Sequence, residues 1–108
     1  MCGSVRVAWY NSFQKSAISR GLEWELTVEF VDAMYELQER KCALSGLEIG
    51  WSEKHWDHSA SIDRIDNSRG YFPDNVQLVH KEVNMMRGSL EPERFVELCQ
   101  LIANKVKW

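Results

Sequence analysis

A chain of 108 residues with 44% hydrophobic and 27% charged residues has the composition of an ordinary folded protein, and its length predicts one domain with one core. Its net charge of −3 argues against a protein that holds nucleic acid by a general basic excess. No apolar run approaches the ~20 residues that cross a bilayer, and the first ten residues lack the apolar centre of a signal peptide, so we expect a cytoplasmic protein without membrane association.

Residues 1–40 are expected to form an N-terminal helical support region. Apolar residues recur at near-helical spacing between Val5 and Ser19, and Gly21 is a natural stop after them. The alternation from Leu22 to Leu26 predicts a short, half-buried strand. Thr27 is then a good N-cap for a second amphipathic helix that ends near Arg40.

The central region, residues 41–90, is predicted to be a hairpin followed by a helix. A turn at Ser45-Gly46 precedes a loop over residues 50–58, and alternating apolar residues then predict a strand from Ala60 to Ile65. Residues 66–70 are dense in turn formers, residues 76–79 predict the second strand, and Lys81 to Arg87 predict a helix with Gly88 at its C-terminal cap. The expected fold class is therefore α+β.

Residues 91–108 are predicted to form a final helix that begins near Pro92. Its apolar face comprises Phe95, Val96, Leu98, Cys99, Ile102, Ala103 and Val106. We expect Cys99 on that face to be a small core residue and not a reactive thiol.

Four polar residues of the central region occur at intervals that could serve one metal ion. Asp63 on the first strand and Asn84 on the helix would offer a carboxylate and an amide oxygen, which suit a sparse Mg²⁺-type site open to a phosphate. His80 lies four residues before Asn84 and has a side chain suited to proton transfer, while Asn75 could position a backbone or a catalytic partner. Taken singly, each residue is more simply a turn or surface group; their order on one unit favours function.

The segments Ser-Ile-Asp-Arg-Ile-Asp, Gly-Tyr, Asn-Val-Gln-Leu-Val-His and Val-Asn-Met-Met-Arg together resemble the small HNH endonucleases carried by phages and mobile elements. The resemblance covers most of residues 16–88. It implies a ββα-metal core flanked by N-terminal and C-terminal helices, in a protein of a bacterial host or phage. It also implies cleavage of DNA phosphodiester bonds with one divalent cation, most simply Mg²⁺, with Mn²⁺ or Ni²⁺ as alternatives.

Carried over to this chain, the resemblance makes Asp63 and Asn84 the metal ligands and Asn75 the central asparagine that orients the catalytic group or braces the loop. The chain departs from the family at the first histidine, where it has Arg64. Arginine cannot be deprotonated in a protein and so cannot be the general base, but its planar fork could clamp the scissile phosphate. His80 becomes the first candidate base, with His58 and His55 as weaker ones.

Many HNH proteins add a structural zinc ion, and the corresponding positions here are Cys42 with Ser45 and His80 with Val83. Only two of these four could bind zinc, which is too few for a closed tetrahedral site. We expect no structural zinc, with Cys42 packed as a small apolar residue. The three cysteines, an odd number, also fit a reducing compartment better than a disulfide framework.

The leading hypothesis is a metal-dependent DNA endonuclease or nicking enzyme. The alternative is a cleavage-deficient HNH-like module that binds DNA or a protein partner, and both Arg64 and the acidic net charge favour it. A homodimer is a further possibility, because a partner subunit could supply specificity. The basic residues available to phosphates are Arg6, Lys15, Arg20, Arg69, Lys81 and Arg87, although solvated surface charges explain those of the first helix equally well.

Overall fold

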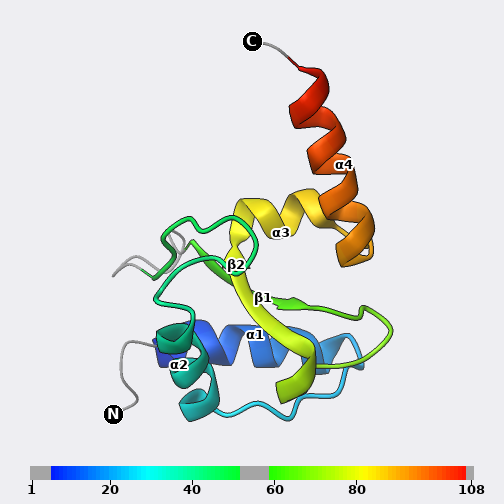
Figure 1. Ribbon diagram of the computed structural model, residues 1–108. Coiled ribbons are helices and arrows are strands. Elements are labelled where there is room, and N and C mark those ends of the chain that lie inside the picture. Colours follow the sequence, from blue (N-terminus) through cyan, green and yellow to red (C-terminus); the bar gives the residue numbers. More distant parts are fainter. Residues whose placement is uncertain (1–5, 52–58, 107–108) are drawn as a thin grey trace.

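The computed structural model describes residues 6–51 and 59–106. The elements follow in the order α1 (Val7–Ser19), α2 (Val28–Leu37), β1 (Ala60–Arg64), the 3-10 turn η2 (Pro73–Asn75), β2 (Val76–His80), α3 (Lys81–Arg87) and α4 (Pro92–Lys105). Figure 1 shows α1 and α2 on one side of the β1–β2 hairpin and α3 on the other, with α4 projecting away. The expected α+β fold, with a hairpin followed directly by a helix, is confirmed.

The first two helices begin and end where local signals place them. α1 is closed by Gly21, which adopts a φ of +73°, and the Leu22 amide donates to the Ala17 carbonyl at 2.9 Å. Glycine suits this position because other residues rarely adopt a positive φ. Thr27 caps α2 as expected, since its hydroxyl accepts a hydrogen bond from the Phe30 amide at 3.0 Å.

The alternating segment from Leu22 to Leu26 is not a regular strand, so that prediction is wrong. Trp24 forms only an isolated bridge to Tyr71, with hydrogen bonds of 2.8 Å from the Glu25 amide to the Tyr71 carbonyl and from the Tyr71 amide to the Glu23 carbonyl. The neighbouring Gly70 allows this approach, because a Cβ there would lie 2.8 Å from the Glu23 carbonyl oxygen. One bridge ties the N-terminal segment to the end of the hairpin loop.

The hairpin supplies the centre of the core. β1 and β2 pair antiparallel, with Ile62 opposite Leu78 and Asp63 opposite Gln77. Ile62 and Leu78 are fully buried against side chains of α1 and α2. Cys42 is also buried there, as expected, and its sulfur accepts a hydrogen bond from the Ser45 amide at 3.3 Å.

Aromatic side chains fill the rest of this core. Trp9 donates from its indole nitrogen to the Ala60 carbonyl at 3.1 Å, which joins α1 to β1. The Trp51 ring packs between those of Trp9 and Tyr35, at centroid distances of 4.8 and 4.7 Å. Such tilted aromatic contacts bury large apolar areas with defined geometry, so the hairpin rests on a rigid base.

The last helix differs most from expectation. Pro92 does occupy its first turn, but Phe95 is the one described α4 residue that is buried. Val96 and Ile102 are 43% and 61% exposed, so the apolar face leaves the core after its first turns. The projection of α4 gives the molecule its elongated extents of 46 × 29 × 24 Å (Figure 1). Among the described helices, α4 included, no span combines the length and apolarity that a membrane crossing requires.

Candidate functional site

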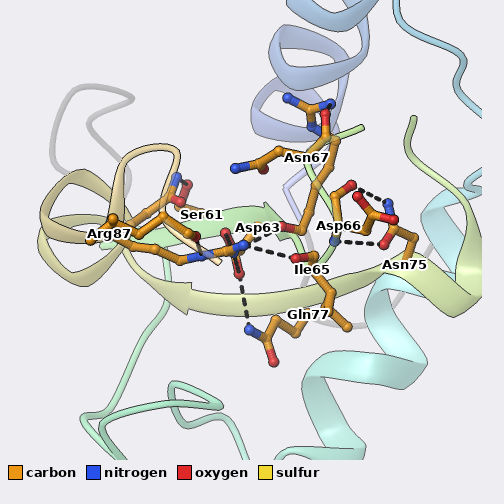
Figure 2. Close-up of polar contacts among 11 residues, drawn as sticks. Ser61, Asp63, Ile65, Asp66, Asn67, Asn75, Gln77 and Arg87 are labelled. Atoms are coloured by element: carbon orange, nitrogen blue, oxygen red, sulfur yellow. Dashed lines mark hydrogen bonds and ion pairs between the residues drawn. The ribbon is translucent and has the colours of Figure 1, made fainter. Parts of the chain in front are cut away.

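Asn75 holds the hairpin loop closed. Its side chain is 1% exposed, and its Oδ1 accepts from the Asp66 amide at 2.9 Å. Its Nδ2 donates to the carbonyls of Asp66 and Gly70, both at 3.0 Å. Figure 2 shows Asn75 facing Asp66 across the start of the loop. The structure therefore gives Asn75 a loop-bracing position, one of the two roles that the family resemblance implies.

The loop itself is rich in short-range polar contacts. Asp66 accepts hydrogen bonds from the amide and hydroxyl of Ser68, at 2.9 and 2.6 Å, and the hydroxyl bond holds the pKa of Asp66 below its usual value. Arg69 forms an exposed ion pair with Asp74 at 2.9 Å. The loop is thus shaped largely by its own side chains.

Asp63 lies inside the interface between the hairpin and α3. Its side chain is almost fully buried, and both carboxylate oxygens accept from Nη1 of Arg87, at 2.6 and 2.7 Å. Oδ2 also accepts from Nε2 of Gln77, its partner across the hairpin, at 2.9 Å. Figure 2 shows Asp63 between these two side chains. Its negative charge is therefore compensated within the protein.

Arg87 is 2% exposed, so the expectation that it contacts phosphate from the surface is corrected. It lies in the last turn of α3, which faces the hairpin, and its guanidinium donates three further hydrogen bonds to backbone carbonyls. The acceptors are the carbonyls of Arg64, Ile65 and Leu90, each at 2.8 Å. Arg87 thus fastens α3 to the end of β1.

Asn84 occupies the same interface one turn earlier on α3. Its Nδ2 donates to the Ser61 hydroxyl at 2.8 Å. Because Ser61 and Asp63 are two residues apart on a strand, they share the face that α3 covers. The structure therefore brings Asp63 and Asn84 to opposite walls of one interface, but it gives each a protein partner.

His80 lies apart from this pair. In the hairpin, His80 pairs with Ala60 and Asp63 pairs with Gln77. The two side chains are therefore three residues apart, roughly 10 Å along the hairpin, and strand alternation places them on opposite faces. The Nδ1 of His80 accepts from the Glu82 amide at 3.1 Å, so the side chain caps the N-terminus of α3. His80 and Asn84 would share a helical face only if the helix began at His80, and α3 begins at Lys81, as predicted. The weaker candidates His55 and His58 lie outside the described residues.

Arg64, which the family resemblance places at the position of the first histidine, reaches into the loop. Its Nη1 donates to the carbonyls of Asn67 and Arg69, both at 2.9 Å, and its guanidinium stacks over the Tyr71 ring at 5.5 Å. Arg20 reaches the same tyrosine, because its Nη2 donates to the Tyr71 hydroxyl at 3.1 Å. The two arginines come together around one aromatic side chain.

The remaining basic residues expected at DNA are divided between regions. Lys15 is exposed on α1, and Arg69 is exposed in the loop beside Tyr71. Lys81 is exposed at the start of α3, at the opposite end of the hairpin, and Arg6 is half-buried just before α1. Arg20, Arg64 and Arg69, at the end of α1 and around the hairpin loop, are hereafter called the Tyr71 surface.

These residues do not fit a divalent metal ion at Asp63. Such an ion needs oxygen ligands with uncompensated negative charge, and here it would have to displace a guanidinium that lies 2.6 Å from the carboxylate. Nor do residues 6–51 and 59–106 place three or more His, Cys, Asp or Glu side chains where they could hold a metal ion together. The sequence analysis did not identify Arg87 as the cation that pairs with Asp63. Arg87 lies three residues after Asn84 and is therefore near the same face of α3.

Comparisons with known proteins bear on the fold. No protein-family model matches the chain. An uncharacterized protein of Acanthamoeba polyphaga mimivirus is 30% identical over 99 residues, which are 92% of this chain but 17% of that protein, so the chain spans a small part of its relative's length. Among solved structures, the rare-cutting HNH restriction endonuclease PacI is similar with a TM-score of 0.69 and 19% identity, over 90% of this chain and 75% of PacI. The chain therefore has the ββα fold of HNH nucleases.

Proposed function

We propose that this protein is a DNA-binding module built on the HNH fold, in which Asp63 does not serve as a catalytic metal ligand. The supporting observation is the buried contact between Asp63 and Arg87, which supplies from within the chain the positive charge that a metal ion would supply. DNA is the proposed ligand because PacI, which shares the fold over 90% of this chain, is a restriction endonuclease.

The Tyr71 surface is the proposed contact with DNA. It gathers Arg20 and Arg64 around the Tyr71 side chain, with Arg69 two residues earlier in the loop, although the chain as a whole carries a net charge of −3. A small number of phosphate contacts on an acidic protein gives modest affinity that falls steeply with salt. We therefore expect binding that tracks the DNA backbone more than its sequence.

Fluorescence anisotropy of a labelled duplex, measured over a range of salt concentrations, tests this proposal. Arg20→Gln should weaken binding and lower the slope of log K against log salt by about 1, the value for one lost phosphate contact. Lys41→Gln is the matched control, because it removes the same charge from an exposed residue after α2. No binding of the wild type at low salt, or equal losses in the two variants, would overturn the proposal.

A metal-dependent endonuclease is the second candidate function, and the shared fold with an HNH restriction endonuclease favours it. It requires Asp63 and Asn84 to act as metal ligands, and hence requires Arg87 to leave Asp63. Incubation of supercoiled plasmid with Mg²⁺, Mn²⁺ and Ni²⁺ separates the two functions. Metal-dependent nicking that disappears in Asp63→Asn supports the endonuclease, whereas intact plasmid beside measurable DNA binding supports the binding module.

We also propose that α4 mediates a homodimer. Its side chains Phe95, Val96 and Cys99 line an apolar groove together with Val83 and Met86 of α3. The exposed apolar residues continue along α4 to Ile102, which is 61% exposed.

The proposed occupant of this groove is α4 of a second copy, in antiparallel orientation. Glu91 precedes α4, and the first half of the helix carries Glu93 and Glu97 with a single arginine, while Lys105 lies at its other end. Antiparallel pairing would place the acidic half of one helix against the basic end of the other. This charge complementarity would fix the register that apolar contacts alone leave loose.

A further inference from the structure

We infer that the Arg87 guanidinium is the resident cation of the ββα unit, and that it holds the hairpin, α3 and the turn after α3 together in the place where related folds would use a metal ion. This inference depends on the contacts of Arg87 and not on DNA binding. Its consequence is a protein whose fold is independent of divalent ions but becomes responsive to them when Arg87 is removed.

The acceptors around Arg87 are all oxygen atoms. Nη1 contacts both carboxylate oxygens of Asp63 and the Arg64 carbonyl, Nη2 contacts the Ile65 carbonyl, and Nε contacts the Leu90 carbonyl, at 2.6–2.8 Å. A carboxylate with several backbone carbonyls is also the kind of ligand set that hard divalent cations prefer. The same set of oxygen atoms is therefore filled by a planar organic cation with fixed hydrogen-bond directions.

These contacts join three parts of the chain. Asp63 and Arg64 belong to β1, Ile65 follows it, and Leu90 lies in the turn between α3 and α4. Arg87 itself closes α3, directly before Gly88, which adopts a φ of +55°. A cation at this point controls how α3 lies on the hairpin.

Removal of Arg87 alone would leave the Asp63 carboxylate buried without a compensating charge. A buried, uncompensated carboxylate is costly and is stabilised by either a proton or a bound cation. Asn84 lies one turn earlier on α3, bonded to Ser61 on the same face of the hairpin as Asp63, and offers an additional oxygen. Arg87→Met should therefore create a divalent-ion response that the wild type lacks.

Thermal unfolding of four proteins, each with EDTA and with Mg²⁺ or Mn²⁺, tests the inference. The wild type should show the same Tm in all conditions. Arg87→Met should have a lower Tm that rises when the ion is added. The double variant Asp63→Asn with Arg87→Met should show no such rise, and Arg69→Met, which removes an arginine from the exposed pair with Asp74, should behave like the wild type.

The inference is overturned if the Tm of the wild type rises with a divalent ion and Asp63→Asn abolishes that rise, since Asp63 would then already hold the ion. It is also overturned if Arg87→Met is as stable as the wild type in EDTA. Should Arg87→Met fail to fold in EDTA, refolding on addition of Mn²⁺ supports the inference. If Arg87→Met folds in neither condition, the effect of the ion on the Tm of the wild type and of Asp63→Asn decides.

Discussion

The hairpin–α3 unit and α4 depart from the usual distribution of side chains in opposite directions. Within the unit, Asp63, Asn75 and Arg87 are polar and almost completely buried. On α4, beyond Phe95, apolar side chains such as Ile102 are exposed. Buried polar groups and exposed apolar patches are the informative exceptions in a folded protein, so each region calls for its own physical explanation.

The difference between the regions lies in whether their side chains have partners. Asp63 and Arg87 satisfy each other, and Asn75 uses both ends of its amide within the loop. A polar network satisfied in this way fixes a unique packing of the core. The apolar stripe of α4 has a groove beside it but no covering element among the described residues, which is the observation behind the proposed dimer.

Arg87→Ala is the substitution with the largest expected effect in the buried region. It leaves the buried Asp63 carboxylate without a compensating charge, with only the Gln77 amide as a donor, and removes the Arg87 donors from three backbone carbonyls, so we expect a loss of about 3–5 kcal/mol in the free energy of unfolding. Replacing both charges, as in Asp63→Leu with Arg87→Met, should recover most of that loss. Urea denaturation measures the free energy of unfolding of both variants. If Arg87→Ala is as stable as the wild type, the account of this network is contradicted.

Asn75→Ala is expected to have the next largest effect. It removes three hydrogen bonds and leaves the Asp66 amide and the Gly70 carbonyl without these partners, while the Asp66 carbonyl keeps the Arg69 amide, so the change should cost about 2–4 kcal/mol. Asn67→Ala is the control in the same loop, because it keeps the carbonyl that Arg64 uses. Equal denaturation midpoints for the two variants would show that Asn75 does not brace the loop.

Substitution on α4 should change assembly and leave the stability of the fold nearly unaltered. Ile102→Asp places a charge in the exposed apolar stripe and should convert a dimer to a monomer, as measured by light scattering after size-exclusion chromatography. Leu37→Asp is the matched control, because Leu37 is 85% exposed at the end of α2, away from α4. A wild type that stays monomeric at high concentration would rule out the proposed dimer.

The smallest expected effect is the pH dependence of the loop. The hydrogen bond from the Ser68 hydroxyl lowers the pKa of Asp66 below the ordinary value of 3.8. A lowered pKa in the folded state means that the stabilisation is fully present above that value and is lost as the pH falls through the folded pKa. The stability difference between the wild type and Asp66→Asn should therefore shrink in acid, and a difference that is constant with pH would contradict this assignment.

Local signals in the sequence were sufficient for most of the fold. The alternation in the hairpin, the turn formers after Asp66, the Thr27 cap and the Gly88 cap predicted elements that the structure confirms. The segment from Leu22 to Leu26 was an exception, because its single bridge depends on the distant Tyr71. Periodicity reports which face is apolar but not whether that face finds a partner, which is why the exposure of α4 was missed.

The candidate site was predicted less completely, for a different reason. The sequence analysis paired Asp63 with Asn84 from their order on one strand–helix unit and from the resemblance to HNH nucleases, and the structure brings the two residues to one interface. The sequence could not show where the long side chain of Arg87 extends, because that depends on the tertiary path of α3 over the hairpin. A shared face for His80 and Asn84 would have required a helix that begins at His80, but α3 begins at Lys81, as predicted, and His80 is its N-cap.

Isothermal titration of the wild-type protein with Mn²⁺ tests the central claim most directly. If Arg87 is the resident cation of the ββα unit, the titration should show no binding that depends on Asp63, and wild type and Asp63→Asn should give the same heats. Stoichiometric binding in the wild type that disappears in Asp63→Asn would contradict the account and would identify Asp63 as a metal ligand.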